Sequence, residues 1–218
     1  MTDMKYIAIL DYHHLDNGMF MKSFAESFSA QKACQAIILH GDSPYTERLL
    51  QTGILRNDAV LRSTKDLNNR IIALLADNGV SGIGINGYQR DIITRNSGSI
   101  TINKEWINNR PRGTHLVLSN LVKDQKNEKI IPVPLNELAT ILSKELKADA
   151  VIYFPDVNKD DLYNSSILER EQRPSETGNT PEYHISESLL PVPENSFLST
   201  LSAFKSLPDI RSLKKFTT

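Results

Sequence analysis

Four short apolar runs, separated by patterns typical of helices and turns, constrain the fold of this chain more than any other feature. They span residues 6–10, 36–39, 82–85 and 150–154. Their β-branched, apolar composition is typical of strands buried on both faces of a parallel sheet. Apolar positions three or four residues apart predict helices between the strands, at residues 17–33, 65–78 and 136–147. The alternation of strand and helix predicts an α/β fold with a mainly parallel central sheet.

The other segments add hairpins and a late polar stretch. Turn residues at 96–98 and at 124–127 predict two hairpins, the second formed by residues 115–122 and 128–133. Residues 158–195 contain four prolines and few apolar side chains, which indicates a long polar loop. A helix at 196–206 and a strand at 210–216 are expected after it. We interpret residues 1–218 as a single domain.

Composition excludes several classes of protein. The formal net charge is −1, so no global field attracts nucleic acid or an anionic membrane, and we expect neither as a partner. No apolar run approaches the ~20 residues needed to span a bilayer, and a cytoplasmic location is expected. The single cysteine, Cys34, has apolar neighbours and is interpreted as a small buried hydrophobe. No cysteine pair or histidine cluster indicates a metal site.

Two glycine-containing turns follow predicted strands and are candidate ligand sites. His40-Gly41 ends the second strand, and residues 84–87 read Gly-Ile-Asn-Gly at the end of the third. Exposed backbone amides at such turns bind phosphate in many α/β proteins, together with the positive end of the following helix. Each turn alone is a weak signal, because glycine is also the ordinary residue of tight turns.

The order of these segments resembles the amino acid kinase family, and among its members the N-acetylglutamate kinases. The resemblance is carried by the His-Gly turn, by Leu-Arg-Ser-Thr at residues 61–64, and by the strand and turn at 80–87. It continues at residues 135–163, with a helix, Ala148-Asp149, an apolar strand and a segment ending in Leu162-Tyr163. The resemblance implies a three-layer αβα sandwich with a mainly parallel central sheet, as in the carbamate kinase-like folds.

The resemblance also implies where catalytic groups of the family fall, and this chain departs from the pattern at each position. The first-strand lysine and the glycine after it fall on Leu10 and Asp11. Asp42 replaces a glycine of the phosphate turn, Asn136 replaces the organising aspartate, and the late lysine falls near Thr200. Phosphoryl transfer depends on positive charge around the moving phosphoryl group. We therefore expect no catalytic residue and no cofactor.

Some binding positions of the family are retained. The resemblance assigns substrate binding to Arg62, Gly41, Asn86 and Gly87, and nucleotide binding to Asp156, Asn158 and Tyr163. Arg62 is expected to grip a carboxylate beside a helix that begins near Lys65 and is capped by Ser63 or Thr64. The alternative for Arg62 is a surface ion pair, and for the nucleotide-loop residues it is a structural turn.

These observations favour an amino acid kinase-like protein that has lost phosphoryl transfer. It is expected to bind a small carboxylate metabolite or a protein partner, as a homo-oligomer or in mixed assembly with a paralogous kinase. Two alternatives stay open. The chain is an active, divergent kinase that uses ATP and Mg²⁺ to phosphorylate the carboxylate of an amino-acid derivative, or it is a structural or storage oligomer of the same fold.

Overall fold

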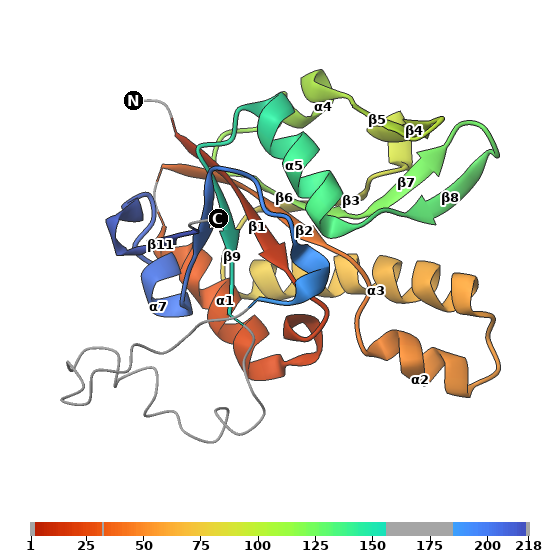
Figure 1. Cartoon of the computed structure of the whole chain (residues 1–218). Helices are drawn as coiled ribbons and strands as arrows, with labels where there is room; N and C mark the ends of the chain where they lie inside the picture. The colour runs from red at the N-terminus through yellow and green to blue at the C-terminus, as the bar shows by residue number, and fades with distance from the viewer. Residues whose placement is uncertain (1–2, 32, 156–184, 217–218) are drawn as a thin grey trace.

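A computed structural model of the chain describes residues 3–31, 33–155 and 185–216. They form a seven-stranded sheet in the order β11-β10-β9-β1-β2-β6-β3 and a four-stranded sheet in the order β5-β4-β7-β8 (Figure 1). The strands of the larger sheet are β1 (Met4–Leu10), β2 (Cys34–His40), β3 (Gly82–Asn86), β6 (His115–Ser119), β9 (Ala150–Tyr153), β10 (Ser196–Leu198) and β11 (Lys214–Lys215). Within this sheet only β11 pairs antiparallel.

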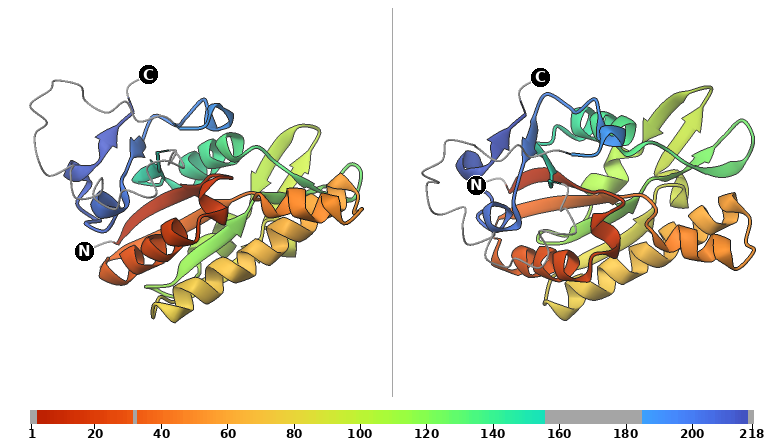
Figure 2. Two further views of the ribbon diagram at one scale, coloured as in Figure 1. Left: turned by 90° about the horizontal axis from the view of Figure 1, so that it is seen from below. Right: turned by 60° about the horizontal axis from the view of Figure 1, so that its bottom comes forward.

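Helices cover both faces of the larger sheet, so the predicted three-layer αβα arrangement is confirmed (Figures 1 and 2). One face carries α1 (Gly18–Ala30), α3 (Arg56–Asp77) and α7 (Leu201–Phe204). The other face carries α4 (Lys104–Asn108) and α5 (Leu135–Leu146). The hairpin of α2 (Tyr45–Gln51) with the start of α3 extends to one side.

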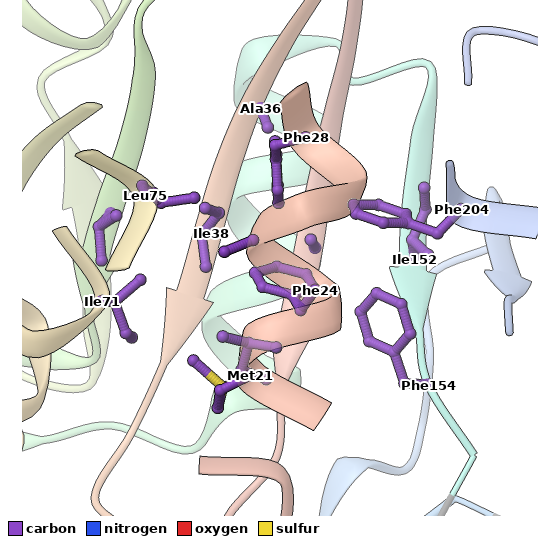
Figure 3. Close-up of a cluster of buried hydrophobic side chains, with 14 of the residues drawn as sticks. Met21, Phe24, Phe28, Ala36, Ile38, Ile71, Leu75, Ile152, Phe154 and Phe204 are labelled. Atoms are coloured by element: carbon purple, nitrogen blue, oxygen red, sulfur yellow. The ribbon is translucent and has the colours of Figure 1, made fainter. Parts of the chain in front are cut away.

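An aromatic cluster fills the space between the sheet and α1 (Figure 3). The spacing of Phe20, Phe24 and Phe28 places all three rings on the buried face of α1, as predicted. The centroid of the Phe24 ring lies 5.4 Å from that of Phe204 and 5.6 Å from that of Phe154. Such pairs add roughly 0.5–1.5 kcal/mol each beyond their burial, so the C-terminal segment is part of this core.

The opposite face has a separate apolar core beneath α5. Leu138 and Leu142 of α5 pack with Ile7 and Ile9 of β1. Leu189 joins this core from η4 (Glu187–Leu189), a 3₁₀ turn within the predicted long loop. The end of that stretch, residues 185–195, is therefore packed on the domain.

The smaller sheet consists of two antiparallel hairpins joined by the parallel pairing of β4 with β7. Its strands are β4 (Ile93–Asn96), β5 (Ser99–Ile102), β7 (Leu121–Asp124) and β8 (Lys129–Pro132). The first hairpin is the predicted one. The second differs from the prediction, because residues 115–122 form two strands: β6 lies in the central sheet between β2 and β3, and only β7 pairs with β8.

Helix boundaries differ from the prediction at two places. Helix α3 begins at Arg56 rather than near Lys65, and Ser63 and Thr64 are buried inside it instead of capping it. The predicted helix at 196–206 is strand β10 followed by the short α7, because β10 extends the sheet beyond β9. Only Lys214 and Lys215 of the predicted last strand are paired, and they follow η5 (Ile210–Ser212).

Two helix ends follow local sequence chemistry. The Asn17 side chain caps α1 by accepting a hydrogen bond from the Phe20 amide at 3.0 Å. Gly79 follows the end of α3 with a φ of 71°, and the amide of Val80 returns to the Leu75 carbonyl at 2.9 Å. In the part of the chain that the structure describes, no helix is long and apolar enough to cross a membrane.

Candidate functional site

The parallel strands of the central sheet end at one edge, and a pocket of about 370 Å³ lies there. Ligands of open α/β sheets bind in the crevice at this edge. The described residues that line the pocket come from the ends of three strands, from the start of α5 and from the segment before β10. They are Asp11, Tyr12, His13, Gly41, Asp42, Asn120, Leu135, Ser186 and Ser188.

His40 lies directly behind the pocket as a buried, neutral imidazole. Its Nδ1 is 2.9 Å from the Gly41 carbonyl oxygen and its Nε2 is 3.1 Å from Nδ2 of Asn68. A carbonyl only accepts and an amide nitrogen only donates, so the imidazole proton is on Nδ1. Complete burial lowers the pKa of His40 to about 4. His40 therefore fixes the conformation of the Gly41 turn rather than acting as a base at neutral pH.

Asn68 fastens helix α3 to the ends of three strands. Besides His40 on β2, its Nδ2 lies 3.2 Å from the carbonyl oxygens of both Ile85 on β3 and Val117 on β6. Gly84 makes this approach possible, since a Cβ there would lie 2.4 Å from Oδ1 of Asn68. A buried polar network thus connects α3 with β2, β3 and β6.

Asp11 and Asp42 give the pocket an acidic wall. Asp11 is 5% exposed, and its Oδ1 accepts a hydrogen bond from the Tyr12 amide at 2.7 Å. Asp42 is half-buried, and its Oδ2 accepts a hydrogen bond from the Thr46 hydroxyl at 3.1 Å. Desolvation raises the pKa of Asp42, although the Thr46 hydrogen bond and the positive charge of Arg56 oppose this.

Asn120, at the end of β6, is a lining residue that the sequence analysis missed. Its backbone amide donates to the His40 carbonyl at 2.9 Å, and its Nδ2 donates to the Val133 carbonyl at 2.8 Å. Its side-chain Oδ1 is buried and accepts no hydrogen bond from the described residues. The one signal in the sequence is the polar pair Ser119-Asn120, which interrupts the apolar run at 115–122.

Basic side chains near the pocket mouth are exposed and form ion pairs. Arg56 is 3.4 Å from Glu47, and Arg48 contacts Asp16. Neither arginine lines the pocket, and its described lining contains no lysine. Among the described residues, no group of three or more His, Cys, Asp or Glu side chains could hold a metal ion.

The structure places the predicted substrate-binding residues at different sites. Gly41 lines the pocket. Asn86 and Gly87 end β3 nearby but are absent from the described lining. The Oδ1 of Asn86 accepts a hydrogen bond from the Ser119 hydroxyl at 2.9 Å. A Cβ on Gly87 would lie 2.6 Å from the Leu121 carbonyl oxygen, so close packing accounts for this glycine.

Arg62 does not lie at a helix N-terminus, so that premise of its predicted anion site is wrong. It occupies the second turn of α3, its side chain is 60% exposed, and its Nε lies 3.9 Å from Oδ2 of Asp66. This is the alternative of a surface ion pair, and it is a weak one. The N-cap of α3 is Leu55, whose side chain makes no capping hydrogen bond.

Two predicted degenerate positions stabilise local structure. Nδ2 of Asn136, in the first turn of α5, donates to the Leu190 carbonyl at 2.5 Å and fastens the segment that carries Ser186 and Ser188. Thr200 caps α7, since its hydroxyl accepts from the Ala203 amide at 3.2 Å. Leu10 is fully buried at the end of β1. The predicted nucleotide-binding residues Asp156, Asn158 and Tyr163 lie outside the described residues.

No family model and no curated protein sequence matches the chain. Solved structures do match it. An isopentenyl phosphate kinase from T. acidophilum, in a product complex, aligns with 97% of this chain and 98% of its own, at 13% identity and a TM-score of 0.57. An aspartate kinase from Synechocystis aligns with 71% of this chain at 13% identity and a TM-score of 0.59.

An N-acetylglutamate synthase from Neisseria gonorrhoeae, complexed with coenzyme A and N-acetylglutamate, aligns with 70% of this chain and 41% of its own. Its identity is 15% and its TM-score is 0.56. The matched part of this chain spans only 28% of the aspartate kinase. At these identities the matches establish the fold, which is amino acid kinase-like.

Proposed function

We propose that this chain is a small-molecule-binding protein that has an amino acid kinase-like fold and does not transfer phosphoryl groups. The observation that carries the proposal is the acidic wall of the pocket. Asp11 and Asp42 occupy the strand ends, and no lysine or arginine is among the described lining residues. A pocket that moves a phosphoryl group must concentrate positive charge at that place.

Electrostatic repulsion from the two carboxylates opposes the binding of a phosphate group in this pocket. Two unit charges about 4 Å apart interact by about 4 kcal/mol at an effective dielectric constant of ~20. Each carboxylate therefore opposes a phosphate at close range unless a cation bridges them. Removing a single transition-state donor typically costs about 3–4 kcal/mol in other enzymes. Two carboxylates in place of donors make efficient transfer unfavourable.

We propose a small carboxylate metabolite as the ligand. The volume of about 370 Å³ suits a small molecule. Helix α5 begins at the pocket with Leu135, and the backbone amides of a first helical turn favour an anionic group. Glu137 in the same turn weakens this attraction. The carboxylate is thus assigned to the α5 side of the pocket and not to Arg62.

Calorimetry and a turnover assay test the proposal together. We expect MgATP to bind more weakly than millimolar, and we expect no ADP release with acidic substrates. Micromolar MgATP affinity, or ADP release that depends on a carboxylate substrate, would establish the active divergent kinase and refute the proposal. ATP and Mg²⁺ would be required only in that case.

The assembly of the chain is a separate part of the proposal. We propose a homo-oligomer, or a mixed assembly with a paralogous kinase. Light scattering after size exclusion tests self-association, and a monomer at micromolar concentration contradicts the homo-oligomer. A stable oligomer that no carboxylate metabolite stabilises against heat would instead favour the structural or storage alternative.

A further inference from the structure

We infer that a second pocket, at the opposite edge of the central sheet, binds a phosphate group through Arg110 and Lys5. This pocket lies where β1 and β2 begin, on the face of the sheet that carries α4 and α5 (Figure 1). The inference is independent of the proposed function, which concerns the pocket at the strand ends. The ligand is free phosphate or a small molecule that carries a phosphate group.

The sheet places Lys5 and Gln35 side by side at this edge. They are register partners on the parallel strands β1 and β2. Ile7 and Ile37, two residues further along, belong to the core beneath α5. Side chains two residues apart on a strand point to the same face. Lys5 and Gln35 therefore point to the face that carries α5, and both line the pocket.

Arg110 comes from the turn between α4 and β6, and its guanidinium is held in a fixed orientation. Its Nε donates to the Thr114 carbonyl at 3.2 Å, and its Nη1 donates to the Ile107 carbonyl at 2.7 Å. These bonds use two of its five N–H groups, and Nη2 makes no hydrogen bond with the described residues. A guanidinium that is fixed in place and keeps unused donors is suited to binding an oxyanion.

The positive charge of Arg110 has no counter-charge in the described part of the chain. Arg110 is partly buried and forms no ion pair with a described carboxylate. Desolvation accordingly lowers its pKa. Its charge also reaches His115, whose pKa is lowered first by burial and then by Arg110. Desolvation of an unpaired cation is unfavourable, and a bound anion offsets that cost.

The lining of this pocket has the opposite charge to that of the pocket at the strand ends. Its described residues include Lys5, Arg110 and the carboxamides of Gln35 and Asn108, but no carboxylate. Asp149 is nearby, but its Oδ2 accepts a hydrogen bond from the Lys5 backbone amide at 2.7 Å, and it is not part of the lining. A phosphate group carries close to two negative charges at neutral pH, which two cations balance.

The small size of the pocket limits what enters it. Its volume is about 10 Å³, which is room for one water-sized atom. One phosphate oxygen would fill it, and the other oxygens would lie at its mouth, where the exposed, flexible Lys5 side chain can approach them. A nucleotide base or an amino-acid side chain does not fit inside. The site therefore recognises the phosphate group alone.

Thermal shift at constant ionic strength is the test. The purified full chain is titrated with inorganic phosphate, glycerol 3-phosphate or acetate, each replacing NaCl. A phosphate compound should raise the Tm along a saturable curve, half complete at a concentration at least tenfold lower than with acetate. The general stabilising effect of phosphate salts does not saturate in this way. An equal or stronger response to glycerol 3-phosphate assigns the site to a phosphate ester, and a response to inorganic phosphate alone assigns it to the free ion.

Variants show whether the effect depends on the two cations. Arg110→Gln should abolish the saturable shift. Lys5→Gln, at an exposed position that tolerates the change, should raise the half-effect concentration at least threefold, which keeps the test decisive if Arg110→Gln does not fold. Lys129→Gln, at an exposed position of β8, is the matched control and should respond like wild type.

Amide spectra locate the bound phosphate. The backbone amides of Gln35 and Asn108 should shift on titration, and those of Gly41 and Asp42 should not. The inference is overturned if no saturable rise in Tm occurs, if acetate is equally effective, if Lys5→Gln responds like Lys129→Gln, or if only Gly41 and Asp42 shift. ATP turnover would refute the proposed function and would not bear on these results.

Discussion

Acidification should destabilise this protein through His40, and the size of the effect follows from its burial. The ordinary pKa of histidine, 6.5, applies to the unfolded chain, whereas burial lowers the pKa of folded His40 to about 4. Between these values the unfolded state binds the proton and the folded state does not. The stability from this group is therefore fully present above pH 6.5 and is lost as pH falls toward 4. From pH 7 to pH 5 the loss is about 2 kcal/mol.

The geometry explains why the folded state resists the proton. A proton on Nε2 would face Nδ2 of Asn68, and two donors would then be opposed at 3.1 Å. Protonation therefore breaks the link between β2 and α3. His115, whose pKa burial also lowers to about 4, adds a loss of the same sign.

Urea denaturation of wild type and His40→Gln at pH 7 and pH 5 measures the effect. The variant is expected to be less stable at pH 7, because its hydrogen bonds are imperfect. Its further loss on acidification should be about 2 kcal/mol smaller than that of wild type, since only the titration of His40 is removed.

Equal pH dependence in wild type and His40→Gln would contradict the reasoning. It would mean that His40 titrates alike in the folded and unfolded chain, or that a cavity around it admits water. The same result would remove the basis for treating His40 as a fixed, neutral support of the Gly41 turn.

Three further changes test the packing around the site. Gly87→Ala should lower the free energy of unfolding by about 1–3 kcal/mol, because the new Cβ would clash with the Leu121 carbonyl oxygen. Gly18→Ala is the control and should not lower it, because a Cβ at Gly18 has no atom within 4 Å. Asn68→Ala should cost about 1–3 kcal/mol by leaving buried acceptors unpaired, and weaker amide-exchange protection at β3 and β6 should accompany it. Phe24→Ala should cost about 3–5 kcal/mol, measured by urea denaturation. A loss below 0.5 kcal/mol in any of these three would contradict the described packing.

Much of the fold was predictable because its strands and helices carry local periodic signals. The rings of α1 recur every four residues, and Gly79 marks the end of α3. The start of α3 was missed for a local reason. Its N-cap, Leu55, lacks a capping side chain, while Ser63-Thr64 imitates a cap inside the helix.

The order of strands in the sheets was less predictable, because strand pairing depends on segments that lie far apart in the sequence. Residues 115–122 read as one apolar strand, but the chain changes sheets at Asn120. Strand β6 lies between β2 and β3, a position that no local pattern of its residues indicates. Strand β1 likewise pairs with β2 and with the distant β9.

The residues of the candidate site also differ in how far local sequence predicts them. Asp11, Gly41 and Asp42 were found because each directly follows a recognisable strand. Asn120 also directly follows a strand, but the predicted strand at 115–122 runs past it. The serines at 186 and 188 reach the pocket only through tertiary folding. Arg62 was assigned from the resemblance and from an expected helix start near Lys65, and the length of α3 removes it from the helix end.

The central position of β1 has a consequence for synthesis on the ribosome. This strand pairs with β2 on one side and with β9 on the other, and β9 pairs with β10 near the C-terminus. Translation at ~5–20 residues per second separates the emergence of β1 from that of β9 by on the order of ten seconds. During that interval one edge of an apolar strand is open to other nascent chains. Strand β1 therefore gains its second neighbour only after the first two thirds of the printed sequence have been made.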